Sequence, residues 1–210
     1  MHISEGVLSA PILIGGGLMT LAGLARGLKD VKSEELPRAA MLAAVFFTAS
    51  LIHVKIGAAS THLVLSGLIG LMMGWAAFPV IFIGLLLQGL LFQFGGLSTL
   101  GINTFNMAAP AVVLGALVRP WVNGSNLKLA SVGGLICGGG SILLSALLVA
   151  FCLVWTGEQF GVSARLLVLG NLPVVVIEAL VTMFCVQFLR KVRPGLLKGY
   201  DPLKDMLDAL

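Results

Sequence analysis

Apolar segments of about 20 residues follow one another along almost the whole chain, and as helices of that length each can span a bilayer. Hydrophobic residues make up 58% of the 210 residues, and charged residues make up 10%. An average soluble domain is about 25% charged. The apolar segments are continuous rather than alternating, which argues against a transmembrane β-barrel. The sequence therefore predicts an all-α, polytopic membrane protein.

Turn-forming residues and charges divide the chain into seven predicted transmembrane helices within a single domain over residues 1–210. Their approximate ranges are 8–28, 37–54, 60–74, 77–94, 104–121, 129–155 and 164–190. The third and fourth are short for a full span, and we interpret them as a helical hairpin. Residues 1–7 precede the first helix, and a tail of about 193–210, predicted to be cytoplasmic, follows the last.

The distribution of Lys and Arg predicts the orientation of the helices, because basic residues favour cytoplasmic loops. With the N-terminus outside and the C-terminus inside, only Lys55 and Arg165 of the 13 basic residues lie outside. This topology accounts for the net charge of +4, so the charge is no evidence for nucleic-acid binding. The first basic residue, Arg26, follows the first apolar segment, so we expect no signal peptide. We expect a multi-pass protein of a prokaryotic cell membrane.

The second residue is a histidine, His2, and its bulk should prevent removal of Met1. The amine of Met1, the deprotonated amide of His2 and the His2 imidazole Nδ1 can bind one ion through fused five- and six-membered rings. Three nitrogens so arranged lie nearly in a plane, and a fourth would complete a square. Square-planar nitrogen coordination is typical of Ni²⁺ and Cu²⁺. For an isolated His2, an accidental exposed terminal residue is the alternative interpretation.

Two other histidines are candidates for the fourth nitrogen, and the predicted topology places both at the outer face. His62 follows a run of small residues and is predicted to open the third helix, with its imidazole directed into an external pocket. His53 is followed by Lys55, whose charge would repel a dication. We therefore prefer His62 as the ligand and interpret His53 as an interfacial residue that ends the second helix.

Three segments carry a resemblance to a known family: MHISEG at the start, STHLVLSGLIG at 60–70 and QGLLFQFGGLSTLGINTFNM at 88–107. They resemble the NikM/CbiM family, the substrate-capture subunits (S components) of nickel and cobalt energy-coupling-factor (ECF) transporters. The resemblance covers essentially the whole chain. It implies a seven-helix fold with an external N-terminus inserted into the bundle, and a metal held by Met1, His2 and His62. The STHL context resembles nickel-type members, which favours Ni²⁺ over Co²⁺ as the substrate.

The resemblance also implies partner chains. These are a transmembrane coupling (T) subunit and two ABC-type ATPase subunits, and a small companion membrane subunit fits as well. The chain contains no GxxxxGK[ST] phosphate loop, so ATP hydrolysis is expected on separate subunits. We therefore expect a transport subunit and not an enzyme.

Three polar residues are candidates for supporting roles. Glu5 either anchors the N-terminal segment near the metal or caps the first helix. Asn103 is our candidate for a buried amide that supports the metal site through hydrogen bonds. Glu178 lies within the seventh predicted helix, where a carboxylate indicates function by default. A hydrogen-bonded core role, in helix packing or partner contact, is the alternative for Glu178.

Two other classes of protein fit the sequence less well. A stand-alone secondary transporter is expected to show paired repeats and ion sites near the bilayer midplane, often with acidic residues. Glu178 is the only charged residue deep in a predicted helix. An intramembrane hydrolase would need a motif such as GxSxG or HExxH, and neither occurs in the chain.

Overall fold

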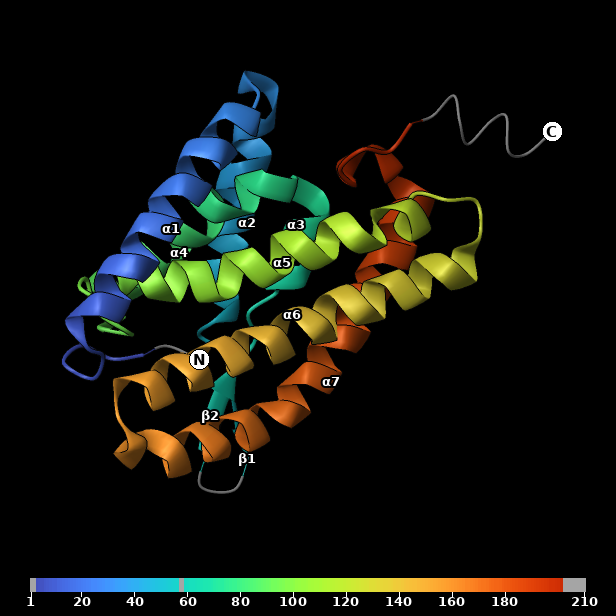
Figure 1. The fold of residues 1–210 in the computed structure, drawn as a ribbon. Helices are drawn as coiled ribbons and strands as arrows, with labels where there is room; N and C mark the ends of the chain where they lie inside the picture. The colour runs from blue at the N-terminus through green and yellow to red at the C-terminus, as the bar shows by residue number, and fades with distance from the viewer. Residues whose placement is uncertain (1–2, 57–58, 202–210) are drawn as a thin grey trace.

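The computed structural model describes residues 3–56 and 59–201, and α-helices carry most of this part of the chain (Figure 1). The helices are α1 (Ala10–Asp30), α2 (Leu36–Ala49), α3 (Ser66–Met73), α4 (Ala77–Phe92), α5 (Leu100–Val122), α6 (Leu127–Thr156) and α7 (Gly161–Val192). Short 3-10 turns are η1 (Ser33–Glu35), η2 (Gly74–Ala76), η3 (Glu158–Phe160) and η4 (Pro194–Leu196). The predominance of helix confirms the predicted fold class, apart from one two-stranded hairpin.

The structure departs most from the prediction between α2 and α3. Strands β1 (His53–Ile56) and β2 (Ala59–His62) pair antiparallel, and His53 stands directly opposite His62 in the register. The predicted end of the second helix at His53 and residue 54 is therefore wrong, because α2 ends at Ala49 and His53 begins a strand. The predicted start of the third helix at residue 60 is wrong as well, because His62 ends a strand and α3 begins at Ser66. Leu65 adopts a left-handed conformation, with φ of 58°, and this conformation prevents a helix from continuing backward through it.

Five helical runs among the described residues are long and apolar enough to cross a membrane. These runs are Ala10–Asp30, Ser66–Phe92, Leu100–Val122, Leu127–Thr156 and Glu158–Val192. The run Ser66–Phe92 contains both α3 and α4, which are separated at Gly74 by a break in the α-helix. The 14 residues of α2 fall short of the roughly 20 needed for a full span. Seven crossings and the orientation of the termini therefore stay predictions.

Helix α5 lies between two groups of helices and connects them (Figure 1). It packs against α1, α3 and α4 on one side and against α6 on the other, and α6 and α7 run side by side. Small residues allow the closest approaches. Gly70 of α3 lies against the backbone of Ala111 of α5, and Gly23 of α1 lies against the ring of Phe78. A side chain at either glycine would overlap its neighbour, so these glycines serve packing within the chain.

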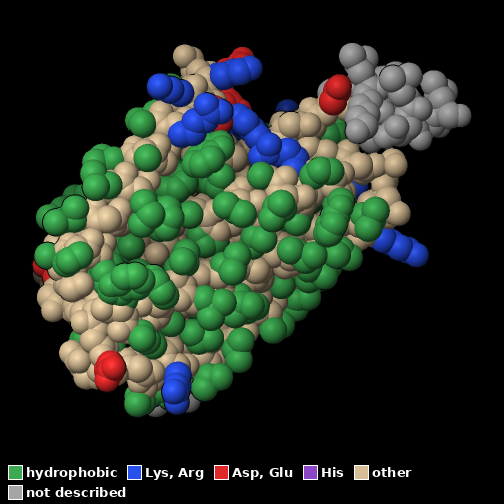
Figure 2. Space-filling model, in the orientation of Figure 1, with side chains coloured by type: hydrophobic (Ala, Val, Ile, Leu, Met, Phe, Trp, Pro, Cys, Tyr) green, Lys and Arg blue, Asp and Glu red, His purple; other side chains and the backbone are tan. Residues whose placement is uncertain are grey.

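Basic side chains gather mainly at one end of the molecule, and apolar side chains cover much of the surface between the ends (Figure 2). At the basic end the segment after α7 folds back, and Arg38 donates to the Leu196 carbonyl oxygen at 3.3 Å. Glu35 pairs with Arg38 and with Lys198. Burial opposes ionisation of Glu35, but the Lys32 amide and the two positive charges hold its pKa below the ordinary value. The described start of the predicted tail is therefore packed against the helices.

Candidate functional site

The N-terminal segment of residues 3–8 enters the helix bundle before α1 begins. Ile3 is 4% exposed and Leu8 is 8% exposed. Both belong to a cluster of buried apolar side chains that includes Ile102 of α5 and Val149 of α6. Removal of this apolar surface from solvent stabilises the inserted position. The residue that follows His2 in the sequence is thus held within the bundle.

Asn103 of α5 binds the backbone of Ile3 in both directions. The Ile3 N–H donates to the Asn103 Oδ1 at 3.1 Å, and the Asn103 Nδ2 donates to the Ile3 carbonyl oxygen at 3.1 Å. The same Nδ2 also lies 3.2 Å from the Thr99 hydroxyl oxygen. Asn103 is buried, so these bonds are shielded from solvent. They satisfy both backbone groups of Ile3 and fix the position of the N-terminal segment on α5.

Glu5 holds the same segment at a second point. Its Oε1 accepts a hydrogen bond from the Ser98 N–H at 3.1 Å, in the loop before α5. The side chain also lies against Gly96, where an added Cβ would overlap it. The N-cap of α1 is Ser9, and no side-chain hydrogen bond caps it. The described contact of Glu5 is therefore the anchoring one, whereas its role near a metal stays a prediction.

Replacement of Asn103 by alanine should loosen the N-terminal segment. Two buried backbone groups of Ile3 would lose their partners, at a cost of about 1–3 kcal/mol for each group. We expect faster hydrogen exchange at the Ile3 amide and a lower melting temperature in detergent. Thr104→Val is the matched control, because Thr104 is also buried in α5 and its hydroxyl bonds to the Leu100 oxygen of the same helix. Equal exchange at Ile3 in both variants would contradict the anchoring role.

His62 is half-buried at the end of β2, and its ring contacts the adjoining loop. The His62 Nδ1 lies 3.0 Å from the Leu63 carbonyl oxygen. A carbonyl oxygen can only accept, so this contact is a hydrogen bond only in those forms of the ring that carry a proton on Nδ1. Metal-binding histidines commonly donate one ring N–H to a carbonyl or carboxylate, which orients the other nitrogen. A His62 ring with its proton on Nδ1 would match this pattern, and ligation through Nε2 stays a prediction.

Glu178 of α7 binds the loop that follows His62, a contact that the sequence did not predict. Its Oε1 accepts from the Leu65 N–H at 2.8 Å and from the Val64 N–H, and its Oε2 lies 3.1 Å from the Leu65 nitrogen. The side chain is fully buried. The apolar context marked Glu178 as unusual, but no local signal indicated a partner more than 100 positions away in the chain.

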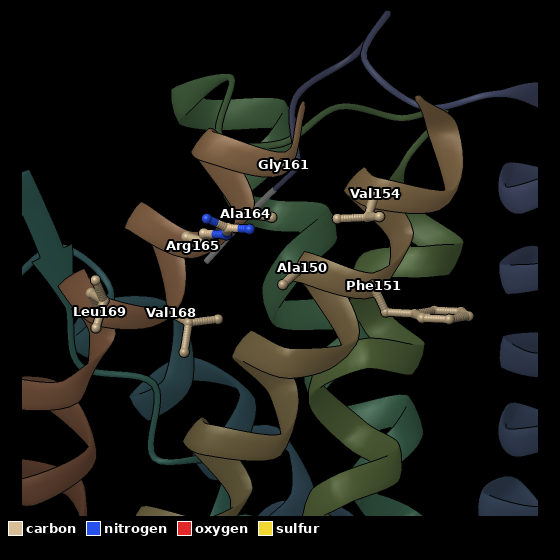
Figure 3. A pocket seen from close by; sticks show the side chains of 8 residues that line it. All are labelled: Ala150, Phe151, Val154, Gly161, Ala164, Arg165, Val168 and Leu169. Atoms are coloured by element: carbon tan, nitrogen blue, oxygen red, sulfur yellow. The ribbon is translucent and has the colours of Figure 1, made fainter. Parts of the chain in front are cut away.

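A hollow of about 660 Å³ lies between the end of α6 and the start of α7 (Figure 3). Phe151 and Val154 of α6 and Val168 of α7 line it, together with Arg165. Its walls are apolar apart from this one guanidinium, which would repel a cation. This hollow offers no set of donors for a metal ion.

The complete predicted ligand set is not within the described part of the chain, because Met1 and His2 lie outside it. His62 is the one proposed ligand whose side chain the structure describes. Among the side chains that the structure describes, no group of three or more His, Cys, Asp or Glu is placed to hold an ion. The arrangement of four nitrogens therefore stays a prediction.

These features define a helical, multi-pass membrane protein with an N-terminal segment bound inside its bundle. Residues 2–196 match the family model CbiM, described as the cobalt uptake substrate-specific transmembrane region. The chain belongs to this family. It is therefore a transmembrane component of a cobalt or nickel uptake system, as the resemblance in the sequence implied.

Relatives extend the comparison. A protein of Haemophilus influenzae assigned to metal transport is 39% identical over 199 residues, which cover 92% of this chain and 95% of that protein. The fused nickel transport protein NikMN of Rhodobacter capsulatus is 30% identical over 139 residues, which cover 63% of this chain and 39% of the fusion. The crystal structure of a transition metal transporter superposes with a TM-score of 0.72 at 23% identity, covering 99% of this chain and 97% of that one. This last likeness supports the fold.

Proposed function

We propose that this chain is the substrate-capture subunit of an ATP-driven ECF transporter and takes up Ni²⁺ from the outer face of the membrane. The ion is bound by the amine of Met1, the amide and imidazole nitrogens of His2, and the imidazole of His62. These four nitrogens form the square that Ni²⁺ favours. Glu5 and Asn103 support the site by holding the segment that follows the chelate.

The observation that carries this proposal is the anchoring of Ile3 inside the bundle. Consecutive Cα atoms are about 3.8 Å apart, so the Cα atom of Met1 lies within about 8 Å of that of Ile3. The two-way bond between Ile3 and Asn103 supports a chelate in this region, because Met1 and His2 directly precede the anchored residue in the sequence. In the proposed site, this anchoring of Ile3 lowers the ordering entropy that remains to be lost when the metal binds.

The choice of Ni²⁺ rests on coordination chemistry and on the STHL context of His62. A deprotonated amide and a planar set of nitrogens are typical of Ni²⁺ sites, and a nickel transport protein is among the relatives. Co²⁺ is the alternative substrate, because the family model describes cobalt uptake. A stand-alone secondary metal transporter is the lesser alternative.

Partner chains complete the proposed transporter. The sequence lacks a phosphate-binding loop, so energy from ATP would come from two ATPase subunits, coupled through a transmembrane T subunit. A small companion membrane subunit is a further proposed partner. Co-purification of the tagged chain with a T subunit and two ATPase subunits would support this assembly, and metal uptake by the chain without any ATPase would overturn it.

The absorption spectrum of the nickel-loaded protein tests the proposed coordination. Square-planar, diamagnetic Ni²⁺ gives a yellow band, and we expect this band to saturate at one ion per chain. Isothermal titration should show tighter binding of Ni²⁺ than of Co²⁺, with Zn²⁺ as the control ion that does not favour a square. An octahedral nickel spectrum would rule out the four-nitrogen square, and tighter binding of Co²⁺ would favour the alternative substrate.

A further inference from the structure

The loop of residues 63–65 connects the strand that ends at His62 with helix α3. Leu65 is the N-cap of α3 and adopts a left-handed conformation, with φ of 58° and ψ of 18°. This conformation is uncommon for a residue other than glycine and persists only where surrounding contacts determine it. The loop is therefore held in a defined shape by its neighbours.

Helix α3 begins without a capping side chain of its own. No side-chain hydrogen bond is made by the N-cap Leu65, and the buried hydroxyl of Ser66 has no hydrogen-bond partner among the described residues. The first amides of a helix need acceptors from elsewhere. Glu178 of α7 accepts hydrogen bonds just before the helix, from the N–H groups of the N-cap residue Leu65 and of Val64.

Close helix packing fixes the distance between Glu178 and the loop. Gly138 of α6 lies against the Glu178 carbonyl oxygen, and Gly67 of α3 lies against the Cys137 carbonyl oxygen. A Cβ at either glycine would overlap these backbone atoms. The Cys137 thiol also donates to the Gly67 carbonyl oxygen at 3.3 Å. The start of α3 and the middle of α7 are thus both held against the same stretch of α6, with little room to move apart.

We propose that Glu178 is a positioning residue for His62. Its carboxyl group fixes the backbone of Val64 and Leu65, two and three residues after His62. The carbonyl group of Leu63, which lies between His62 and Val64 in the chain, contacts the imidazole and orients it. The inference rests on the proposed function, in which His62 is a metal ligand. Residues that orient a ligand typically change metal affinity by about 10–100-fold when they are replaced.

The test compares Glu178→Ala, Glu178→Gln and Thr182→Val with the unaltered protein. Thr182 is the control because it is also fully buried on α7, one turn from Glu178, and its hydroxyl has no hydrogen-bond partner among the described residues. In metal-free protein, Glu178→Ala should raise hydrogen exchange at the Val64 and Leu65 amides by at least about tenfold. With NiCl₂, it should lower affinity by about 10–100-fold and alter the nickel absorption band.

Glu178→Gln keeps one accepting oxygen, so we expect its exchange rates, affinity and spectrum to lie between those of the alanine variant and the unaltered protein. It also carries the test if the alanine variant does not fold. Unchanged exchange at Val64 and Leu65 in both variants would overturn the anchoring contact. Faster exchange with an unchanged nickel affinity and spectrum would overturn the positioning role.

The two proposals fail in different ways. If the unaltered protein bound neither Ni²⁺ nor Co²⁺, the proposed function would fail, and with it the role of Glu178 in a metal site. If the unaltered protein bound nickel and the variants of Glu178 matched Thr182→Val in every measurement, only the inference about Glu178 would fail.

Discussion

Two glycines placed before Met1 should lower the nickel affinity of the protein by at least about 100-fold, which corresponds to about 2.7 kcal/mol. The extension converts the amine of Met1 into an amide and moves the free amine away from His2. The five-membered ring that joins the amine to the His2 amide nitrogen is then lost. Ile3, its bonds to Asn103, and His62 are not altered. Isothermal titration with NiCl₂ measures the change.

The length of this extension matters. With one added residue, the histidine would become the third residue of the chain. Its imidazole, the new terminal amine and the two intervening amides could then form a four-nitrogen chelate without His62. Two added residues avoid that arrangement. Two glycines placed after Leu210 serve as the control and should leave the affinity unchanged. Equal affinity of the two extended proteins would exclude the amine of Met1 as a ligand.

The long helices could be predicted from the sequence because the thickness of the bilayer sets their length. The predicted ranges 8–28, 104–121, 129–155 and 164–190 each fall within α1, α5, α6 and α7, apart from two residues before α1. Continuous apolar sequence is sufficient for this purpose, since every backbone group in lipid must be paired within the helix. The agreement between the predicted and observed helices therefore follows from the lipid environment more than from specific side chains.

The region between α2 and α3 could not be predicted in the same way. Residues 50–65 contain both apolar and small polar residues, which hydropathy alone reads as the end of one helix and the start of the next. The conformation of the described residues in this range depends on pairing between strands and on the left-handed Leu65. The acceptor that holds this loop, Glu178, belongs to a distant helix. Such contacts are tertiary, and periodicity contains no information about them.

For the candidate site, the sequence indicated candidate residues but not the groups that they contact. The sequence singled out His62, Glu5 and Asn103 by residue type and position. The structure adds that Asn103 binds the Ile3 backbone and that Glu5 reaches the loop before α5. Both contacts join segments more than 90 residues apart, so residue types could indicate candidates but not their partners.

His53 and His62 lie opposite each other in the hairpin, so alanine variants of the two residues form a matched pair that tests which histidine is the fourth nitrogen ligand. Replacement of a residue that supports a ligand typically weakens metal binding by about 10–100-fold. His62→Ala should weaken nickel binding by more than this, because it removes a direct ligand. His53→Ala should change the affinity little, although it alters the cross-strand partner of the same residue. Isothermal titration and the nickel absorption band measure both variants.

Added imidazole separates a lost ligand from a damaged hairpin. If His62 supplies only the fourth nitrogen, free imidazole can take its place, and millimolar imidazole should restore the yellow band in His62→Ala. It should have no effect on the band of His53→Ala, whose site is complete. Equal losses in the two variants would show that the hairpin as a whole, and not the His62 ring, is needed for binding. A full loss in His53→Ala alone would assign the fourth nitrogen to His53.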